Sequence, residues 1–224
     1  MASNLNVEQI NGTNYSPYTF RNVLINGDFR VNQRDFDGDW SALTDGAYGY
    51  DRWKKLGTNI QQVVEEGNYK PNTVYTLSGV NVTTTQITSP ASGHWAITVP
   101  NTATHVQLEE GSLATPFELR SVGLELALCQ RYYEFIEALS AIGSNYFSNN
   151  NAQVVVYFEK KRVIPSITSD SFVYVYGNQT YSDSLGYGNR IEKSSARGFF
   201  SRFLFTQGDS MPGVINNLRI DAEL

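Results

Sequence analysis

The pattern of apolar residues changes its period near residues 110–121, and this change constrains the fold more than any other feature. The stretch HWAITVPNTATHVQLEEG alternates apolar and polar residues, as a half-buried strand does, at Trp95, Ile97, Val99, Val106 and Leu108. The same alternation is expected to point His94, His105, Gln107 and Glu109 outward. After Ser121 the apolar residues recur at helical spacing, at Leu124, Leu128, Tyr132, Phe135 and Leu139. A β module is therefore expected to end near residue 110, and a helix to follow it.

The composition favours β structure on both sides of this helix. Aromatic residues make up 13% of the chain, and charged residues make up 17%, which is below the usual share of about 25%. Short Tyr-, Thr- and Val-rich runs separated by turn residues are typical of antiparallel sheets. The sequence predicts an all-β protein of two antiparallel β-sandwich modules joined by one α-helix.

Four segments follow from these patterns. Residues 1–21 are polar and Asn-rich, and they are expected to form an attachment arm that orders only against a partner. A first sandwich is expected at 22–119, a connecting helix at 120–143 and a second sandwich at 144–224. Within the first sandwich, NVLINGDFRVNQR (22–34) predicts two strands around an Asn26-Gly27 turn, with Phe29 and Val31 on an apolar face.

The charge and the cysteine content exclude several classes of function. The formal net charge is −5 and basic residues cluster only at 54–55 and 160–162, so no nucleic-acid partner is expected. A single cysteine, Cys129, allows no intrachain disulfide and no cysteine-based zinc site. The chain shows neither a signal peptide nor a membrane-spanning run, so we expect cytoplasmic synthesis and no membrane insertion.

No enzyme is expected. The Gly-Asp-Ser block ending at Ser210 resembles the nucleophile block of an esterase class, but no histidine follows His105 to act as its base. Glu109 and Glu110 are adjacent on a predicted strand and point to opposite faces, so they cannot flank one glycosidic bond. No catalytic residue is therefore predicted.

Two weak metal patterns occur in the sequence, and each has a simpler interpretation. The acidic run at 35–39 resembles half of a calcium loop, but its glycine is fourth instead of sixth, and a solvated hairpin tip is the simpler interpretation. His94 and His105 flank a hairpin with no carboxylate near them in sequence, and solvent-facing strand histidines explain them better. No metal and no cofactor is expected, and a structural calcium is left open.

A segment of the second module has the composition of a binding surface. GNQTYSDSLGYGN (177–189) combines rigid tyrosines with small polar residues, a combination also found in antibody binding loops. A mobile surface loop is an equally good interpretation. The predicted glycan-contacting residues are Tyr181, Asp183, Tyr187 and Asn189, with Trp40 and Tyr48 of the first module as a second choice.

The predicted helix is apolar on two sides. A helix on the surface of a monomer needs one buried stripe, so a second stripe indicates a helix held between domains or subunits. The residues expected in a subunit interface are Leu124, Leu128, Tyr133 and Phe135.

Four motifs in the sequence resemble tail fibre and tail-tip proteins of tailed bacteriophages. They are NVLINGDFRVNQR, YGYDRW, VQLEEGSLATPFELRS and ELALCQRYYE, and they span residues 22–135, while the chain ends in DAEL. In those proteins such motifs bracket a jelly-roll module like a carbohydrate-binding module, and a compact β domain often follows. The resemblance implies that residues 22–119 form a reduced jelly roll and that 144–224 form a receptor-binding head.

The resemblance also implies a function. It indicates a homotrimeric structural protein of the virion tail, a fibre or fibre tip, that binds a host cell-surface polysaccharide during adsorption. Residues 1–20 would attach it to other tail proteins. The alternative is a purely structural adaptor or decoration protein that binds only other virion proteins.

Overall fold

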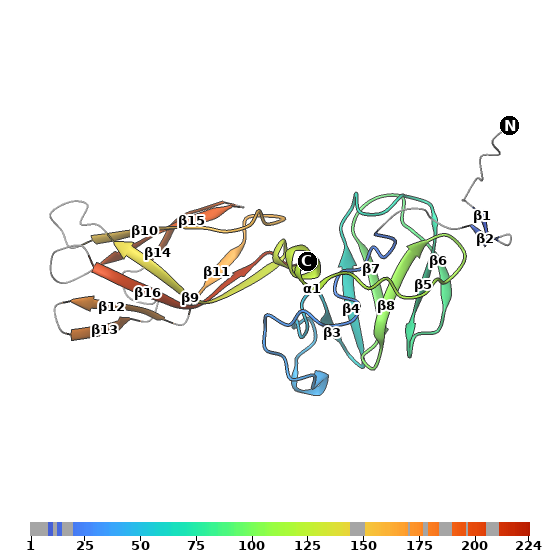
Figure 1. Cartoon of the computed structure of the whole chain (residues 1–224), viewed down its shortest axis with the longest axis horizontal. Helices are drawn as coiled ribbons and strands as arrows, with labels where there is room; N and C mark the ends of the chain where they lie inside the picture. Colours follow the sequence, from blue (N-terminus) through green and yellow to red (C-terminus); the bar gives the residue numbers. More distant parts are fainter. Residues whose placement is uncertain are drawn as a thin grey trace. The chain divides into compact units, whose positions relative to one another are not determined.

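The computed structural model describes residues 9–10, 13–14, 20–143, 151–169, 171–176, 179–183, 190–195, 197–204 and 211–224. The chain divides into two compact units, Met1–Leu126 (unit 1) and Ala127–Leu224 (unit 2). Figure 1 shows strands dominating both units. The prediction of a mostly β chain is therefore confirmed for the residues that the structure describes.

Unit 1 contains two three-stranded antiparallel sheets, with the orders β3-β4-β7 and β6-β5-β8. Their strands are β3 (Lys54–Leu56), β4 (Asn59–Val64), β5 (Val74–Val80), β6 (Thr85–Thr88), β7 (Trp95–Pro100) and β8 (Thr104–Glu110). A short ribbon of β1 (Gln9–Ile10) and β2 (Thr13–Asn14) precedes them. A 3-10 turn, η1 (Trp40–Ala42), follows the N-cap residue Asp39.

The two sheets of unit 1 share one hydrophobic core. Ile60 and Val64 come from β4, Ile97 and Val99 from β7, and Leu108 from β8, and all are buried. The predicted alternation of β7 is confirmed, since its threonine and alanine positions are exposed between these core residues. Period-2 patterning therefore identified β7 and β8, two of the strands that contribute to this core.

The hairpin predicted at 22–34 is wrong. Residues 20–39 contain no regular strand, and Asn26 and Phe29 have positive φ angles of 55° and 59°. Asparagine side chains bond to the backbone here and replace the hydrogen bonds of a sheet ladder. The segment nevertheless lies along β8, because the N–H of Val23 donates to the carbonyl of Leu108 and the N–H of Val106 donates to that of Gly27.

The helix is shorter than predicted. Helix α1 spans Val122–Gln130, and the next element is a long strand, β9 (Tyr133–Gly143). The sequence YEFIEAL fits a helical stripe, but its aromatic and β-branched residues equally suit a strand. Pairing of β9 with the C-terminal strand β16 (Met211–Asp221) selects the strand conformation.

Unit 2 is built around β16. Strand β9 pairs along one edge of β16, while β11 (Ser166–Thr168) and β12 (Ser171–Tyr176) pair with successive parts of the other edge. β13 (Gln179–Asp183) extends this sheet beyond β12, and a second sheet has the order β10 (Asn151–Tyr157), β15 (Gly198–Leu204), β14 (Arg190–Ser195).

Among the described residues no helix combines the length and the hydropathy that a membrane crossing requires.

Candidate functional site

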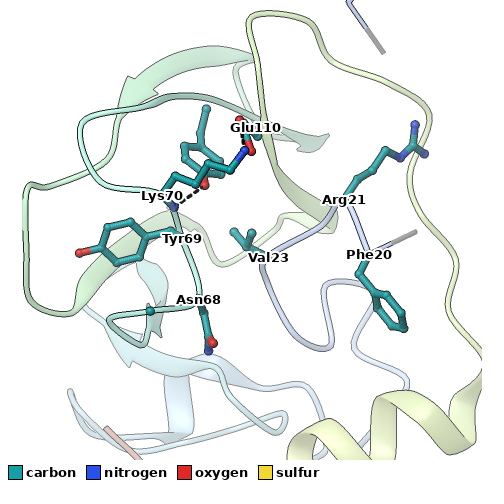
Figure 2. A pocket seen from close by; sticks show the side chains of 9 residues that line it. Phe20, Arg21, Val23, Asn68, Tyr69, Lys70 and Glu110 are labelled. Carbon is teal, nitrogen blue, oxygen red and sulfur yellow. Dashed lines mark hydrogen bonds and ion pairs between the residues drawn. The ribbon is translucent and has the colours of Figure 1, made fainter. Parts of the chain in front are cut away.

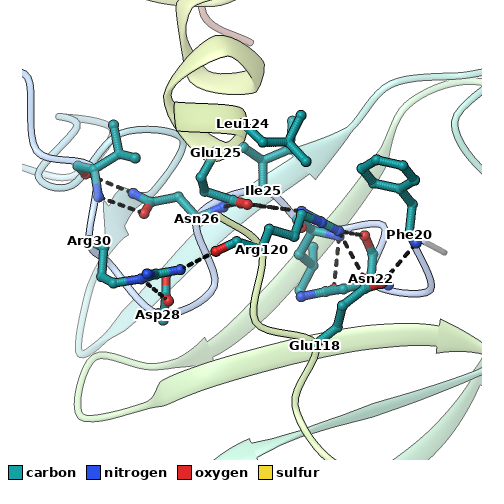
Figure 3. A network of polar contacts seen from close by, with 12 residues as sticks. Phe20, Asn22, Ile25, Asn26, Asp28, Arg30, Glu118, Arg120, Leu124 and Glu125 are labelled. Carbon is teal, nitrogen blue, oxygen red and sulfur yellow. Dashed lines mark hydrogen bonds and ion pairs between the residues drawn. The ribbon is translucent and has the colours of Figure 1, made fainter. Parts of the chain in front are cut away.

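Arg120 is the centre of a buried polar network in unit 1 (Figure 3). Its guanidinium donates hydrogen bonds to the two carboxylate oxygens of Glu125 at 3.2 and 3.3 Å. It also donates to the carbonyls of Leu24, at 3.1 Å, and Asn22. The carboxylate of Glu118 lies 3.5 Å from the same guanidinium. One arginine thus joins the start of unit 1, the segment after β8 and helix α1.

Glu118 anchors the backbone of residues 20–22. Its carboxylate oxygens accept hydrogen bonds from the backbone N–H groups of Phe20 at 2.8 Å and Asn22 at 2.9 Å. Burial alone would raise the pKa of Glu118, but the N–H groups of Asn22, Phe20 and Arg21 and the charge of Arg120 hold it below its ordinary value.

Asn26, which is fully buried, also holds nearby backbone in place through its hydrogen bonds. Its side chain bonds both the N–H and the carbonyl of Val31, at 2.9 and 2.8 Å, and its own N–H donates to Glu125. The indole N–H of Trp53 donates to the carbonyl of Asn26 at 2.9 Å. Asp51, which accepts a hydrogen bond from the N–H of Gln33 at 2.6 Å, is also buried.

The segment after β8 folds back over that strand. Glu109 accepts hydrogen bonds from the N–H of Thr115 and from its hydroxyl, each at 2.7 Å. The N–H of Glu118 donates to the side-chain oxygen of Gln107 at 2.7 Å. Gln107 and Glu109 are only 1% and 3% exposed, so the prediction that they face solvent is wrong: residues 111–121 cover them.

The motifs that carry the phage resemblance are therefore largely structural. Asn26, Asp51, Trp53, Glu109, Glu118, Arg120 and Glu125 all belong to these motifs, and they hold unit 1 together through the hydrogen bonds above. The next candidates for a binding site are residues outside these seven.

A cavity of about 340 Å³ in unit 1 offers such residues. Figure 2 shows Phe20 and Arg21 on one side, Asn68 and Tyr69 on the other, and Val23 between them. Gly67, Lys70, Tyr75 and Glu110 complete the lining. The volume lies at the lower end of the range of about 300–1,000 Å³ that is typical of ligand sites.

Both walls of the cavity are fixed by hydrogen bonds. The Phe20 wall is held by Glu118, as described above. On the other wall the carbonyl of Lys70 accepts a hydrogen bond from the hydroxyl of Ser89 at 2.6 Å, and the hydroxyl of Tyr69 donates to the carbonyl of Gly93. The ring of Tyr69 also packs edge-on against Trp95. The cavity is thus preformed, which lowers the entropy cost of binding a ligand.

An ion pair lies at the edge of the cavity. The ammonium of Lys70 is 2.7 Å from the carboxylate of Glu110, and their side chains remain 64% and 39% exposed. The hydroxyl of Tyr75, which also lines the cavity, accepts a hydrogen bond from the backbone N–H of Lys70 at 2.9 Å. These groups supply donors and an acceptor beside the apolar side chains of Val23 and Phe20, as a polyhydroxylated ligand requires.

Of the glycan residues predicted in 177–189, the structure describes two, Tyr181 and Asp183. Tyr181 lies on β13, opposite Tyr174 of β12, and Asp183 ends the same strand opposite Phe172. The prediction of a single loop over 177–189 is therefore wrong for this part of it. Tyr187 and Asn189 lie outside the described residues.

The second-choice residues are not an open binding surface. Trp40 is 7% exposed and packs against the rings of Phe36 and Tyr50, so its face is not available to stack on a sugar. Tyr48 is half-buried, and the guanidinium of Arg34 lies 5.0 Å from its ring centre. Trp40 lies on η1 and its side chain is part of the core.

The predicted interface residues have different environments. Leu124 and Leu128 are half-buried on α1. Tyr133 is 5% exposed within unit 2, which removes it from the candidate interface. Phe135 is half-buried on β9, with the guanidinium of Arg219 5.8 Å from its ring centre.

Comparison with known proteins gives no further guide: no family model, no curated protein and no solved structure matches this chain. Sequence reasoning also missed the cavity residues. Gly67-Asn68-Tyr69-Lys70 has the Gly, Asn and Tyr composition that nominated 177–189, and this signal could have found one wall. Phe20, Arg21 and Glu110 carry no comparable signal, because only the tertiary fold brings them to the same cavity.

Proposed function

We propose that this chain is a structural protein of a bacteriophage tail, a fibre or fibre tip, that assembles as a homotrimer and binds a host cell-surface glycan. The proposal includes the finer architecture: unit 1 is a reduced jelly-roll-like sandwich, and unit 2 is a second sandwich. The protein would be located in the virion after synthesis in the host cytoplasm, with residues 1–20 attaching it to other tail proteins.

The observation that carries the proposal is that polar side chains of the 111–121 segment and α1 are buried, while apolar side chains there are exposed. Thr115, Glu118 and Arg120 point inward and are hydrogen-bonded within unit 1. Leu119 and Val122 are 68% and 50% exposed. A solvent-facing loop normally has the opposite arrangement, so this surface is suited to contact another chain.

Helix α1 continues the same arrangement. Its single charged residue, Glu125, is 4% exposed and paired with Arg120. The exposed and half-exposed positions are Val122, Gly123, Leu124, Leu126, Ala127 and Leu128, followed by the polar Gln130 at the end of the helix. Three copies that pack these residues around a common axis would bury them, and a fibre would acquire three receptor sites on one axis.

The test introduces a charge into the proposed interface. Because Leu119 is exposed, Leu119→Asp should leave the monomer folded but convert a trimer to monomers in static light scattering, since a buried unpaired charge is costly. Val80→Asp is the matched control: Val80 is 53% exposed at the end of β5. A wild-type monomer at micromolar concentration would contradict the trimer.

Glycan binding is tested by adsorption of the purified wild-type protein to host cells. Saturable binding that is lost when surface polysaccharide is stripped supports the proposal. The exposed 111–121 surface equally suits a different virion protein. Binding to tail proteins without binding to cells would therefore identify the purely structural adaptor.

A further inference from the structure

We infer that the unit 1 cavity binds an acidic sugar, a pyranose carrying a carboxylate, within the surface glycan. This inference rests on the proposed function and specifies the receptor chemistry. It also places the glycan site in unit 1, away from the 177–189 segment.

The first argument is charge. Arg21 and Lys70 line the cavity with a single carboxylate, Glu110, so the formal charge of the lining is positive on a chain whose net charge is −5. Glu110 pairs with Lys70 at 2.7 Å, while Arg21 donates a long hydrogen bond of 3.5 Å to the carbonyl of Pro116. A guanidinium has five N–H donors, so Arg21 can bind a ligand carboxylate and keep this contact.

The second argument is the balance of hydrogen-bonding groups. Tyr75 accepts a hydrogen bond from the N–H of Lys70, and its own hydroxyl proton remains to be donated. The Asn68 amide also has donors, and the side chain is exposed at the cavity. The lining residues Arg21, Lys70, Tyr75 and Asn68 carry donors, with Arg21 at the rim (Figure 2), against one carboxylate, Glu110. A ligand rich in acceptors therefore complements the site better than a neutral sugar does.

The third argument explains why the ligand is a sugar and not a small acid. Phe20 is 55% exposed beside the cavity, and Val23 lies between its two walls (Figure 2). An exposed aromatic ring and an aliphatic side chain offer contacts to the C–H groups of a pyranose. Glu110 can accept a hydrogen bond from a ring hydroxyl, a contact that acetate cannot make.

The test compares two ligands that differ at one carbon. The full-length protein is titrated with glucuronate and with glucose, and binding is followed by ligand-observed NMR. We expect glucuronate to bind roughly tenfold more tightly, the effect of one charge-assisted hydrogen bond. Acetate serves as the competitor that carries the carboxylate without the ring, and it should displace glucuronate poorly.

Variants assign the binding to the cavity. Arg21→Gln should weaken glucuronate binding roughly tenfold and leave glucose binding unchanged, whereas Phe20→Ala should weaken both ligands. Lys160→Gln, at an exposed lysine of unit 2, is the matched charge control and should change neither. Thermal unfolding midpoints equal to wild type show that a loss of binding is not a loss of folding.

Each outcome decides the inference. Equal affinity for glucose and glucuronate, or undiminished glucuronate binding by Arg21→Gln, overturns it, and strong competition by acetate overturns the sugar component. Failure of the acidic-sugar inference can be distinguished from failure of the proposed glycan binding. A protein that adsorbs to host polysaccharide but does not bind glucuronate refutes only the acidic-sugar inference. A protein that binds no cells and no saccharide refutes glycan binding as a whole.

Discussion

At the residue scale, the charged side chains of unit 1 that most resemble a catalytic cluster have structural roles. Glu118, Arg120 and Glu125 are charged and close together, yet each is engaged with the backbone of residues 20–26. Buried charges are tolerated only when paired and hydrogen-bonded. These three residues therefore stabilise the module by holding residues 20–26 in place.

Glu118 predicts a loss of stability in acid. Its pKa is below the ordinary value of 4.5, because the N–H groups of Asn22 and Phe20 and the charge of Arg120 outweigh its burial. The stabilisation is fully present above pH 4.5 and is lost as the pH falls through the lowered pKa of the folded state. Denaturant unfolding between pH 7 and pH 3 should show a smaller decline for Glu118→Gln than for the wild type.

The pH dependence of the wild type alone would not isolate Glu118, because Asp51 also changes the stability with pH. Burial raises the pKa of Asp51 above 3.8 despite its hydrogen bonds from Gln33 and the charge of Arg34. Its effect has the opposite sign, since stability falls as the pH rises from 3.8 through the raised pKa. Both proteins keep Asp51, so the difference between their pH profiles isolates Glu118. Parallel profiles would contradict its role.

A single glycine permits the close approach of residues 22–27 to β8. A Cβ atom on Gly27 would lie 2.1 Å from the carbonyl oxygen of Val106, which is fixed backbone. Gly27→Ala should therefore cost about 1–3 kcal/mol of unfolding free energy, measured by urea denaturation. Gly123→Ala is the control, because nothing lies within 4 Å of its Cβ position on α1. It should be neutral or stabilising, and an equal loss in both variants would refute the steric argument.

At the scale of elements, the 111–121 segment buries the second face of β8, the one that carries Gln107 and Glu109. Alternation along β8 correctly placed Val106 and Leu108 in the core. The same rule assigned Gln107 and Glu109 to solvent, because a local pattern cannot show that a later segment will cover them. The side chain of Thr115 completes the cover through its bond to Glu109.

Thr115→Val should loosen this cover. The change keeps the shape of the side chain but removes the hydroxyl that donates to Glu109 at 2.7 Å. We expect a loss of about 0.5–1.5 kcal/mol and faster amide hydrogen exchange at 112–118. The same substitution at Thr98, which is exposed on β7 and accepts a hydrogen bond from Gln61, is the control. Unchanged exchange in Thr115→Val would show that the hydroxyl is dispensable.

The elements predicted correctly from the sequence are those whose conformation is determined by nearby residues in the chain. Strand β7 alternates regularly, so its period located it, and the same period placed Val106 and Leu108 of β8 in the core. The hairpin at 22–34 failed because the side chain of Asn26 competes with the sheet for backbone partners. The helix beyond Gln130 failed because β16 supplies a partner edge for residues 133–143. The candidate cavity joins residues 20–23, 67–75 and 110, and no local pattern links these segments.

At the scale of the whole molecule, the boundary between Leu126 and Ala127 falls inside α1. Each unit has its own buried residues: in unit 2 they include Leu218, Ile220, Tyr132 and the ion pair of Lys161 with Glu134. The ammonium of Lys161 also donates to the carbonyl of Gln130. Burial lowers the pKa of Lys161 although Glu134 opposes the shift, so this lysine is held where an unpaired charge would be costly.

The two units should therefore unfold in separable transitions. Lys161→Met leaves the carboxylate of Glu134, whose side chain is 13% exposed, without its cation, and should lower the midpoint of the unit 2 transition alone. Gly27→Ala should lower only the midpoint of the unit 1 transition, because its clash lies at β8. Differential scanning calorimetry of the wild type and both variants measures this at one fixed protein concentration, since assembly also shifts midpoints. The double variant should show the sum of the two effects, as expected for sites without shared partners. A single transition that moves equally in both variants would show instead that the units unfold cooperatively through α1.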